Sequence, residues 1–290
     1  MTRAYSLYPG CTLHSTGLEY GVSARAVCQA LDVELIELDD WNCCGASSAH
    51  SLDAELADAL PARDLLLAQE RRLDIAIPCA ACYGRLRSAQ ARLRRDAAFR
   101  QRMEQAVGRR FAEAAQPRSL LEILAGEVPR QEIARRVRRP LAGLRPVSYY
   151  GCLLLRPPEI AGGWDDTERP AKLDGLLTSL GAQPQPWSYA TDCCGASMTL
   201  NRSDLVLELV GRLFDAAADA GANCIVTACP LCQANLDTRQ GRRRMAVFYF
   251  TELIGLAMGL RGMGQLLSRH ITDPRPTLRD CGLDWHDLRD

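Results

Sequence analysis

The five residues Cys43-Cys44-Gly45-Ala46-Ser47 occur a second time, unchanged, as Cys193-Cys194-Gly195-Ala196-Ser197. Each copy is preceded by a single cysteine and followed by a Cys-x-x-Cys pair. The first set of five is Cys11, Cys43, Cys44, Cys79 and Cys82, and the second is Cys152, Cys193, Cys194, Cys229 and Cys232. A repeat of this kind predicts two equivalent cysteine sites in one chain.

The spacing of the cysteines indicates an internal duplication. The last four cysteines of each set lie 150 residues from their counterparts, whereas Cys11 lies 141 residues from Cys152. The nine-residue difference falls in the loop around residues 156–170, where an insertion is well tolerated. We therefore predict two cysteine-rich halves, residues 1–145 and residues 146–290, the second with a C-terminal extension.

Short apolar runs lead into the cysteines of both halves. Runs at residues 4–9, 33–38, 75–77, 147–150, 185–189 and 224–228 favour extended chain, and 245–250 favours a last strand. Helical patterns lie between them at residues 15–31, 52–67, 83–113, 173–180 and 205–218. This alternation predicts an α/β fold with mainly parallel sheets. Ligands of such sheets bind beyond the carboxyl ends of the strands, so three cysteine loops of each half can converge.

The composition is that of an ordinary globular protein. The 290 residues carry 35 basic and 35 acidic side chains, so whole-chain charge gives no reason to expect nucleic acid as a partner. No signal peptide is recognisable, and no run of about 20 apolar residues predicts a transmembrane segment. We expect a cytoplasmic protein, in which thirteen cysteines indicate metal or redox chemistry rather than disulfides.

Five cysteines at this spacing fit an iron–sulfur centre better than the alternatives. A structural zinc ion takes four ligands, commonly as two short-spaced pairs. A disulfide shuttle would use only the Cys-x-x-Cys pairs and leave the other six cysteines unexplained. Adjacent cysteines tend to point apart, which suits two metal atoms, and iron–sulfur centres offer several. Gly10, Gly45, Gly151 and Gly195 flank the cysteines and allow the backbone to approach a cluster and donate N–H groups to its sulfur.

Longer motifs surround the cysteines. They are Tyr8-Pro-Gly-Cys-Thr-Leu13, Asp40-Trp-Asn-Cys-Cys-Gly-Ala46, Tyr150-Gly-Cys-Leu-Leu-Leu-Arg-Pro-Pro158, Trp187-Ser-Tyr189 and Phe250-Thr-Glu-Leu-Ile-Gly-Leu256. Together they resemble the cysteine-rich domains in the B subunit of heterodisulfide reductase. The resemblance covers most of residues 5–260 and includes all ten motif cysteines.

The resemblance implies that each set of five cysteines ligates one noncubane [4Fe-4S] cluster. It implies that the two clusters face each other across a pseudo-twofold axis and cleave or form a disulfide between them, each cluster taking up one sulfur. It also implies that electrons pass singly through a ferredoxin-like iron–sulfur subunit and a flavin subunit of the same complex. The chain itself has no P-loop or flavin fingerprint.

The substrate implied by the resemblance is a thiol, a disulfide or a sulfur carrier. Lys172 is the only lysine in the chain, a bias typical of GC-rich bacterial genomes. This bias favours a bacterial sulfur-metabolism homologue acting on protein- or lipoate-bound sulfur over an enzyme of methanogens.

Two other functions remain open. The same pair of domains occurs in iron–sulfur subunits of lactate or glycolate oxidation complexes and in the membrane-associated subunit of some succinate:quinone reductases. The apolar helix expected after Thr251 would suit contact with a membrane, although it is short and interrupted by glycine. A structural zinc protein without a redox role is the third interpretation.

A few further residues are weaker candidates. His14 lies three residues after Cys11 and is placed to protonate a departing thiolate, and Arg156 follows the second cluster loop, where it can hold an anionic group. For both, an ordinary packing or salt-bridge role competes with catalysis. Three cysteines outside the sets are expected to be small buried hydrophobes (Cys28 and Cys224) or a bystander (Cys281). The charged, proline-rich tail from Arg269 is expected to pack loosely.

Overall fold

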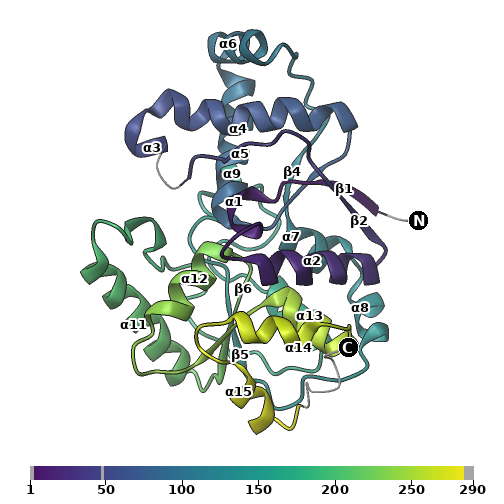
Figure 1. The fold of residues 1–290 in the computed structure, drawn as a ribbon, viewed down its shortest axis with the longest axis vertical. Helices are drawn as coiled ribbons and strands as arrows, with labels where there is room; N and C mark the ends of the chain where they lie inside the picture. The colour runs from purple at the N-terminus through teal and green to yellow at the C-terminus, as the bar shows by residue number, and fades with distance from the viewer. Residues whose placement is uncertain (1–2, 47–48, 284–290) are drawn as a thin grey trace.

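Two small parallel sheets form the framework of the protein (Figure 1). The computed structural model describes residues 3–46 and 49–283. The first sheet contains β1 (Arg3–Leu7), β2 (Val33–Glu37), β3 (Ile75–Ile77) and β4 (Pro117–Ser119) in the order β2-β1-β3-β4. The second contains β5 (Pro146–Tyr149), β6 (Cys224–Thr227) and β7 (Ala246–Tyr249) in the order β5-β6-β7. Each strand pair in the described chain is parallel.

The second sheet repeats the strand order of the first. Extended chain around residues 183–185 lies beside β5 as β2 lies beside β1. The Gln183 N–H donates to the Leu144 carbonyl at 2.9 Å, and the Gln185 N–H donates to the Pro146 carbonyl at 2.7 Å. The predicted α/β fold with parallel sheets and an internal duplication is therefore confirmed. The boundary between residues 145 and 146 falls between the two sheets and stays a prediction.

The strands are buried, and helices connect them. All residues of β3, β5, β6 and β7 are buried, as parallel strands covered on both faces require. The helices before β5 are α1 (Gly10–Leu13), α2 (Leu18–Ala30), α3 (Ala49–Leu52), α4 (Ala54–Ala68), α5 (Ala80–Arg95), α6 (Ala97–Val107), α7 (Leu120–Glu122) and α8 (Arg130–Arg136). Those after it are α9 (Pro158–Ala161), α10 (Lys172–Ser179), α11 (Ser203–Asp219), α12 (Pro230–Arg239), α13 (Phe250–Met258), α14 (Met263–Leu266) and α15 (Arg275–Asp280).

The arginine-rich region predicted as one helix over residues 83–113 is two helices. The break falls at Asp96, whose carboxylate accepts a hydrogen bond from the Phe99 N–H at 2.9 Å and so caps the start of α6. The two helices meet at this residue, and α6 projects at one end of the molecule (Figure 1). The short strand β4, which follows at Pro117–Ser119, was not anticipated from the sequence.

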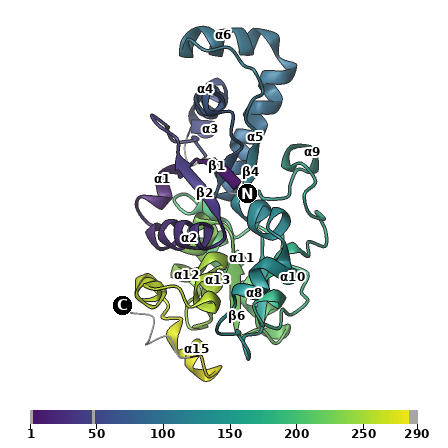
Figure 2. The ribbon, with the colours of Figure 1, turned by 90° about the vertical axis from the view of Figure 1, so that its right-hand side faces the viewer.

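The segment that follows the last strand of each half packs against the other half. After β7, α13 lies along α2 (Figure 1). After β4, a π-helical turn (Ile123–Glu127) and α8 lie against α10 (Figure 2). Both segments begin with the same cap, because Glu122 accepts from the Ser119 N–H at 3.2 Å and Glu252 from the Tyr249 N–H at 2.9 Å. The two halves therefore exchange equivalent elements.

Helix α13 is part of the core. All nine of its residues are buried. The Thr251 hydroxyl lies 2.7 Å from the Ser23 hydroxyl on α2, so even its polar side chain is used in packing. The expectation that this helix touches a membrane is therefore wrong, because its apolar side chains face protein. Within residues 3–46 and 49–283, no helix has the length and apolarity needed to cross a membrane.

The tail is more ordered than its composition suggests. His270 is buried, with its Nε2 2.9 Å from a Glu252 carboxylate oxygen and its Nδ1 3.2 Å from the Gln233 amide. The Thr272 N–H donates to Asp237 at 2.9 Å. The expected loose packing is thus wrong up to residue 283, because buried carboxylates on α12 and α13 supply partners for the polar groups of the tail. Residues 284–290 lie outside the described chain.

We expect the stability of the protein to fall as the pH rises from about 6.5 to about 9. Burial alone lowers the pKa of His270, but the charge and hydrogen bond of Glu252, with Asp237 and Glu19 nearby, raise it to about 9. A pKa higher in the folded than in the unfolded chain gives stability that is complete below the unfolded value of about 6.5 and is lost through the folded value.

The variant His270→Gln should remove this pH dependence. Urea midpoints measured from about pH 6 to about pH 9.5 should fall with pH in the wild type and change less in the variant. His14→Gln is the matched control, because the His14 side chain is half exposed. An unchanged slope in His270→Gln, or an equal loss of slope in the control, would contradict the assignment.

Candidate metal centre

The cysteines lie where strands end and helices begin. Cys11 is in α1, which starts three residues after β1. Cys79 and Cys229 directly precede α5 and α12, and each helix carries the second cysteine of its pair in the first turn. The N-terminus of a helix favours a thiolate over a thiol, because unpaired backbone N–H groups point toward the sulfur. The predicted convergence of strand-end loops is therefore present in both halves.

Buried thiols are paired in the same way in the two halves. The Cys44 and Cys82 sulfurs are 3.3 Å apart, and the equivalent Cys194 and Cys232 sulfurs are 3.7 Å apart. The neighbouring thiols of Cys43 and Cys82 lower the pKa of Cys44, and the thiol of Cys232 lowers the pKa of Cys194. Each set thus favours an anionic sulfur, the form in which cysteine binds metals.

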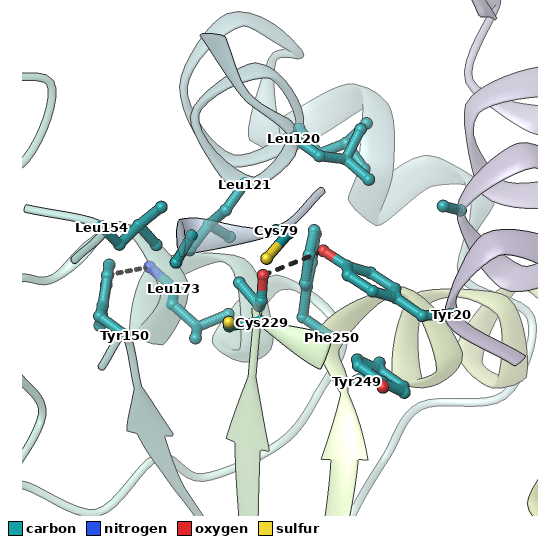
Figure 3. Packing of buried hydrophobic residues seen from close by; sticks show 14 of the residues in the cluster. Tyr20, Cys79, Leu120, Leu121, Tyr150, Leu154, Leu173, Cys229, Tyr249 and Phe250 are labelled. Atoms are coloured by element: carbon teal, nitrogen blue, oxygen red, sulfur yellow. Dashed lines mark hydrogen bonds between the residues drawn. The ribbon is translucent and has the colours of Figure 1, made fainter. Parts of the chain in front are cut away.

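The two sets meet at Cys79 and Cys229 (Figure 3). Both residues are buried, and each thiol is near enough to shift the pKa of the other. Hydrogen bonds from the Cys232 and Cys79 thiols, and from the backbone N–H groups of Cys232 and Ala80, lower the pKa of Cys229. Ala80 belongs to the first half, so a sulfur of the second half is stabilised by a helix of the first. We call this contact the seam.

Two glycines leave room for sulfur. Gly10 and Gly151 have positive φ angles of 65° and 69°, a conformation that favours glycine. A Cβ atom at Gly10 would lie 3.1 Å from the Cys82 sulfur, and one at Gly151 would lie 3.0 Å from the Cys232 sulfur. Two further backbone N–H groups, those of Gly45 and Gly195, point to the sulfurs of Cys43 and Cys193 at 3.4 and 3.3 Å.

This donor set fits an iron–sulfur cluster. Ligand sulfurs of such clusters carry negative charge, and backbone N–H donors stabilise it. Six of the ten thiols are buried, Cys43, Cys152 and Cys193 are half-buried, and Cys11 is exposed. In the described part of the chain, no three His, Cys, Asp or Glu side chains surround one point that could hold a single metal ion. The described thiols instead lie as a series of neighbouring pairs.

A pair of buried tyrosines, which the sequence reasoning missed, holds the loops before the Cys-Cys pairs. The Tyr8 hydroxyl donates to the Asn42 carbonyl at 2.7 Å. The Tyr149 hydroxyl donates to the Asp192 carbonyl at 2.7 Å. Both acceptors directly precede a Cys-Cys pair, so each tyrosine ties a strand end to a cysteine loop. A tyrosine at the same position in both repeats was the signal in the sequence.

The surroundings of the two sets differ in charge. Asp64 is buried beside the first set, where burial and the neighbouring Cys44 raise the pKa of its carboxyl to about 8. Arg85 is near enough to Cys44 to favour its thiolate form, in addition to the thiol hydrogen bonds. The residues 150 positions later are Phe214 and Asn235. The first set therefore has a cation and a buried carboxyl where the second has neutral side chains.

The weaker candidates lie among ordinary partners. The His14 ring is 3.1 Å from the Glu37 carboxylate and stacks on Trp41. The Arg156 guanidinium donates to Glu168 at 2.9 Å. Neither contact assigns a catalytic role. Among the cysteines outside the sets, Cys28 and Cys224 are buried in α2 and β6, as expected, and Cys281 is half-buried beside Asn223.

Comparison with known proteins identifies the family of the chain. Residues 5–87 and residues 147–237 match the family described as "CCG: Cysteine-rich domain". The chain therefore belongs to the CCG cysteine-rich domain family, and the two matches agree with the repeat predicted from the cysteines.

Several named relatives match most of the chain. The 8-methylmenaquinol:fumarate reductase membrane anchor subunit of Wolinella succinogenes is 30% identical over 94% of this chain and 98% of its own length. The B subunit of the ferredoxin:CoB-CoM heterodisulfide reductase of Methanosarcina mazei is 27% identical over 88% of this chain and 89% of its own. A protein of Archaeoglobus profundus, named as similar to the heterodisulfide reductase B subunit, is 26% identical over 88% of this chain and 90% of its own length. The predicted resemblance to the heterodisulfide reductase family is confirmed, and these relatives support an iron–sulfur subunit of an oxidoreductase.

The fold also occurs among solved structures. The crystal structure of a hypothetical protein from Helicobacter pylori superposes with a TM-score of 0.73 at 11% sequence identity. The match covers 94% of this chain but 52% of that protein, so this chain spans about half its length. At this identity the likeness concerns the fold alone.

We expect Gly10→Ala to destabilise the protein more than Gly108→Ala does. Both glycines have positive φ, so alanine at either position costs about 1 kcal/mol of backbone strain. Only at Gly10 does the new Cβ also press on a sulfur, because no atom lies within 4 Å of a Cβ at Gly108. Urea denaturation of the three proteins tests this expectation. If the two variants lose equal free energy of unfolding, the close approach to Cys82 does not contribute to stability.

Proposed function

We propose that the chain is the catalytic subunit of a heterodisulfide-reductase-like complex and that it holds two noncubane [4Fe-4S] clusters. The ligands would be Cys11, Cys43, Cys44, Cys79 and Cys82 for one cluster and Cys152, Cys193, Cys194, Cys229 and Cys232 for the other. The contact between Cys79 and Cys229 supports this proposal most directly. Each set supplies one of these two thiols. A substrate disulfide that is cleaved or formed at the seam would therefore have one set of ligands on each side.

Bound clusters would supply single electrons and Lewis-acidic iron for cleaving or forming a sulfur–sulfur bond. The residues of the chain would hold and insulate them. Backbone N–H groups of Gly45 and Gly195 would stabilise negative sulfur, and the buried Cys79 and Cys229 would keep water from the seam. The exposed Cys11 marks a side of the site that solvent reaches, and there a substrate would enter.

The substrate and partners follow from the same proposal. A thiol, a disulfide or a protein- or lipoate-bound sulfur carrier would be the substrate. A ferredoxin-like iron–sulfur subunit and a flavin subunit would exchange electrons with the clusters. The names of the relatives support membership of a complex, because each of the first two is called a subunit.

A second candidate is the iron–sulfur subunit of a quinol-linked reductase. It is favoured by the fumarate reductase relative, whose match extends over 94% of this chain. The two candidates differ in what exchanges electrons with the reduced or oxidised iron–sulfur protein. Reduction of the metal-loaded protein by a menaquinol analogue, with no oxidation by disulfides, would favour the second candidate. Oxidation by a disulfide without a response to the quinol would favour the first.

Anaerobically prepared protein should contain about eight iron and about eight acid-labile sulfide per chain, the content of two four-iron clusters. Cys44→Ser and Cys194→Ser should each lose about half of both, because each removes a buried ligand from one set. Chemical analysis of iron and sulfide measures these contents, and EPR spectroscopy detects the clusters that remain.

The control for these variants is Cys28→Ala. Cys28 is as buried as Cys44 and Cys194 but lies in α2 outside the sets, so its loss should leave the iron content unchanged. Zinc in place of iron and sulfide would contradict the proposal and support the structural zinc protein. Loss of all iron in either serine variant would show that the two sets do not load independently.

A further inference from the structure

One hydroxyl group contacts equivalent backbone atoms of both halves. Tyr20 lies in α2, and its side chain is fully buried. Its hydroxyl oxygen is 3.2 Å from the Pro78 carbonyl oxygen and 3.2 Å from the Ala228 carbonyl oxygen. Pro78 and Ala228 are 150 residues apart and directly precede the seam cysteines Cys79 and Cys229. The hydroxyl is therefore equally far from equivalent backbone atoms of the two halves, beside the seam (Figure 3).

The two distances indicate a shared hydrogen bond. A tyrosine hydroxyl has a single proton to donate, and both acceptors here are carbonyl oxygens. A hydroxyl that donates to one oxygen usually lies about 2.7–2.8 Å from it, so two equal, longer distances fit one proton shared between two acceptors. Without this proton, two buried carbonyl oxygens would face each other with no donor between them, which is unfavourable.

The ring that carries this hydroxyl is held by the second half. It stacks on Tyr249 with centroids 4.3 Å apart and planes 7° apart, and it meets Phe250 edge to face at 6.2 Å. The hydroxyl is thus fixed relative to both halves at once.

Tyr20 has no counterpart in the second half. Residues 161–170, which stand 141 to 150 positions later, contain no tyrosine. The hydroxyl therefore serves both halves, although the residue occurs in only one of the two repeats.

We propose that Tyr20 is a positioning residue that sets the separation of Cys79 and Cys229. It draws the two carbonyls that precede these cysteines toward one proton and so fixes how closely the halves meet. If the proposed function holds, Tyr20 also fixes the distance between the two metal centres, and this part of the proposal rests on that function. The contact between the thiols does not depend on that function and can be tested without metal.

The test compares the wild type with Tyr20→Phe, which keeps the ring stack and removes only the hydroxyl. In metal-free protein, diamide takes two electrons and two protons from Cys79 and Cys229, which become joined by a sulfur–sulfur bond while diamide becomes the hydrazine. Mass spectrometry of peptides gives the yield of this bridge. We expect a roughly fivefold lower yield in the variant, the population change that loss of one net hydrogen bond produces.

Iron-loaded protein gives a second readout. We expect Tyr20→Phe to bind as much iron as the wild type but to show weaker magnetic interaction between the two clusters in EPR spectra. Two controls separate positioning from general stability. Tyr5→Phe removes a partly buried hydroxyl that donates to Glu127 in the first half, and Thr251→Val removes the hydrogen bond between Ser23 on α2 and Thr251 on α13. Both should keep the bridge yield and the magnetic interaction of the wild type.

The outcomes are distinct. The proposal would be overturned if Tyr20→Phe left the bridge yield and the magnetic interaction unchanged. It would also be overturned if both controls changed these two quantities as much as Tyr20→Phe does. If none of the proteins binds iron, the proposed function fails, and the bridge yield alone decides the role of Tyr20. A lower bridge yield confined to Tyr20→Phe supports the positioning role in either case.

Discussion

The contact between Cys79 and Cys229 can form only if the two halves are held at one separation. Three features of the chain meet this requirement. The segments after β4 and β7 cross to the opposite half, Tyr20 shares its proton between carbonyls of both halves, and the Ala80 N–H helps to lower the pKa of the Cys229 thiol. Each feature uses groups from both sides, so the seam is a property of the whole chain. The small sheets serve mainly to deliver the cysteines to this place.

The repeat and the fold class were predictable because their signals are local. Strands that end at a cysteine are visible as short apolar runs, and the 150-residue offset needs only subtraction. The sequence-based predictions were wrong where contacts between distant segments or a single capping bond determine the structure. The tail is polar, yet His270 is buried because Glu252, distant in the sequence, provides its partner. The break at Asp96 depends on one capping bond within a region of otherwise uniform helical pattern.

The cysteines of the candidate site could be recognised in the sequence, but their surroundings could not. The ten cysteines follow from the motif, and Tyr8 and Tyr149 occur at matching positions in the two repeats. Tyr20 could not be found in this way, because it has no second copy. Asp64 and Arg85 lie beside the first set, and the equivalent positions of the second set hold neutral residues. The two sets are therefore electrostatically unequal. Identical ligands therefore do not imply identical reduction potentials, since nearby charge shifts the balance between oxidised and reduced clusters.

The exchanged segments also bear on the ancestry of the chain. Two separate copies of a single half, joined by the same exchange, would form a closed twofold dimer with its cysteines facing across the axis. In such a dimer every substitution appears twice, so a residue on the axis would meet its own copy. Fusion of the copies into one polypeptide removes that restriction. A lone tyrosine shared between the two halves, and a charged residue beside only one set, are changes that a single fused gene can acquire and a homodimer cannot.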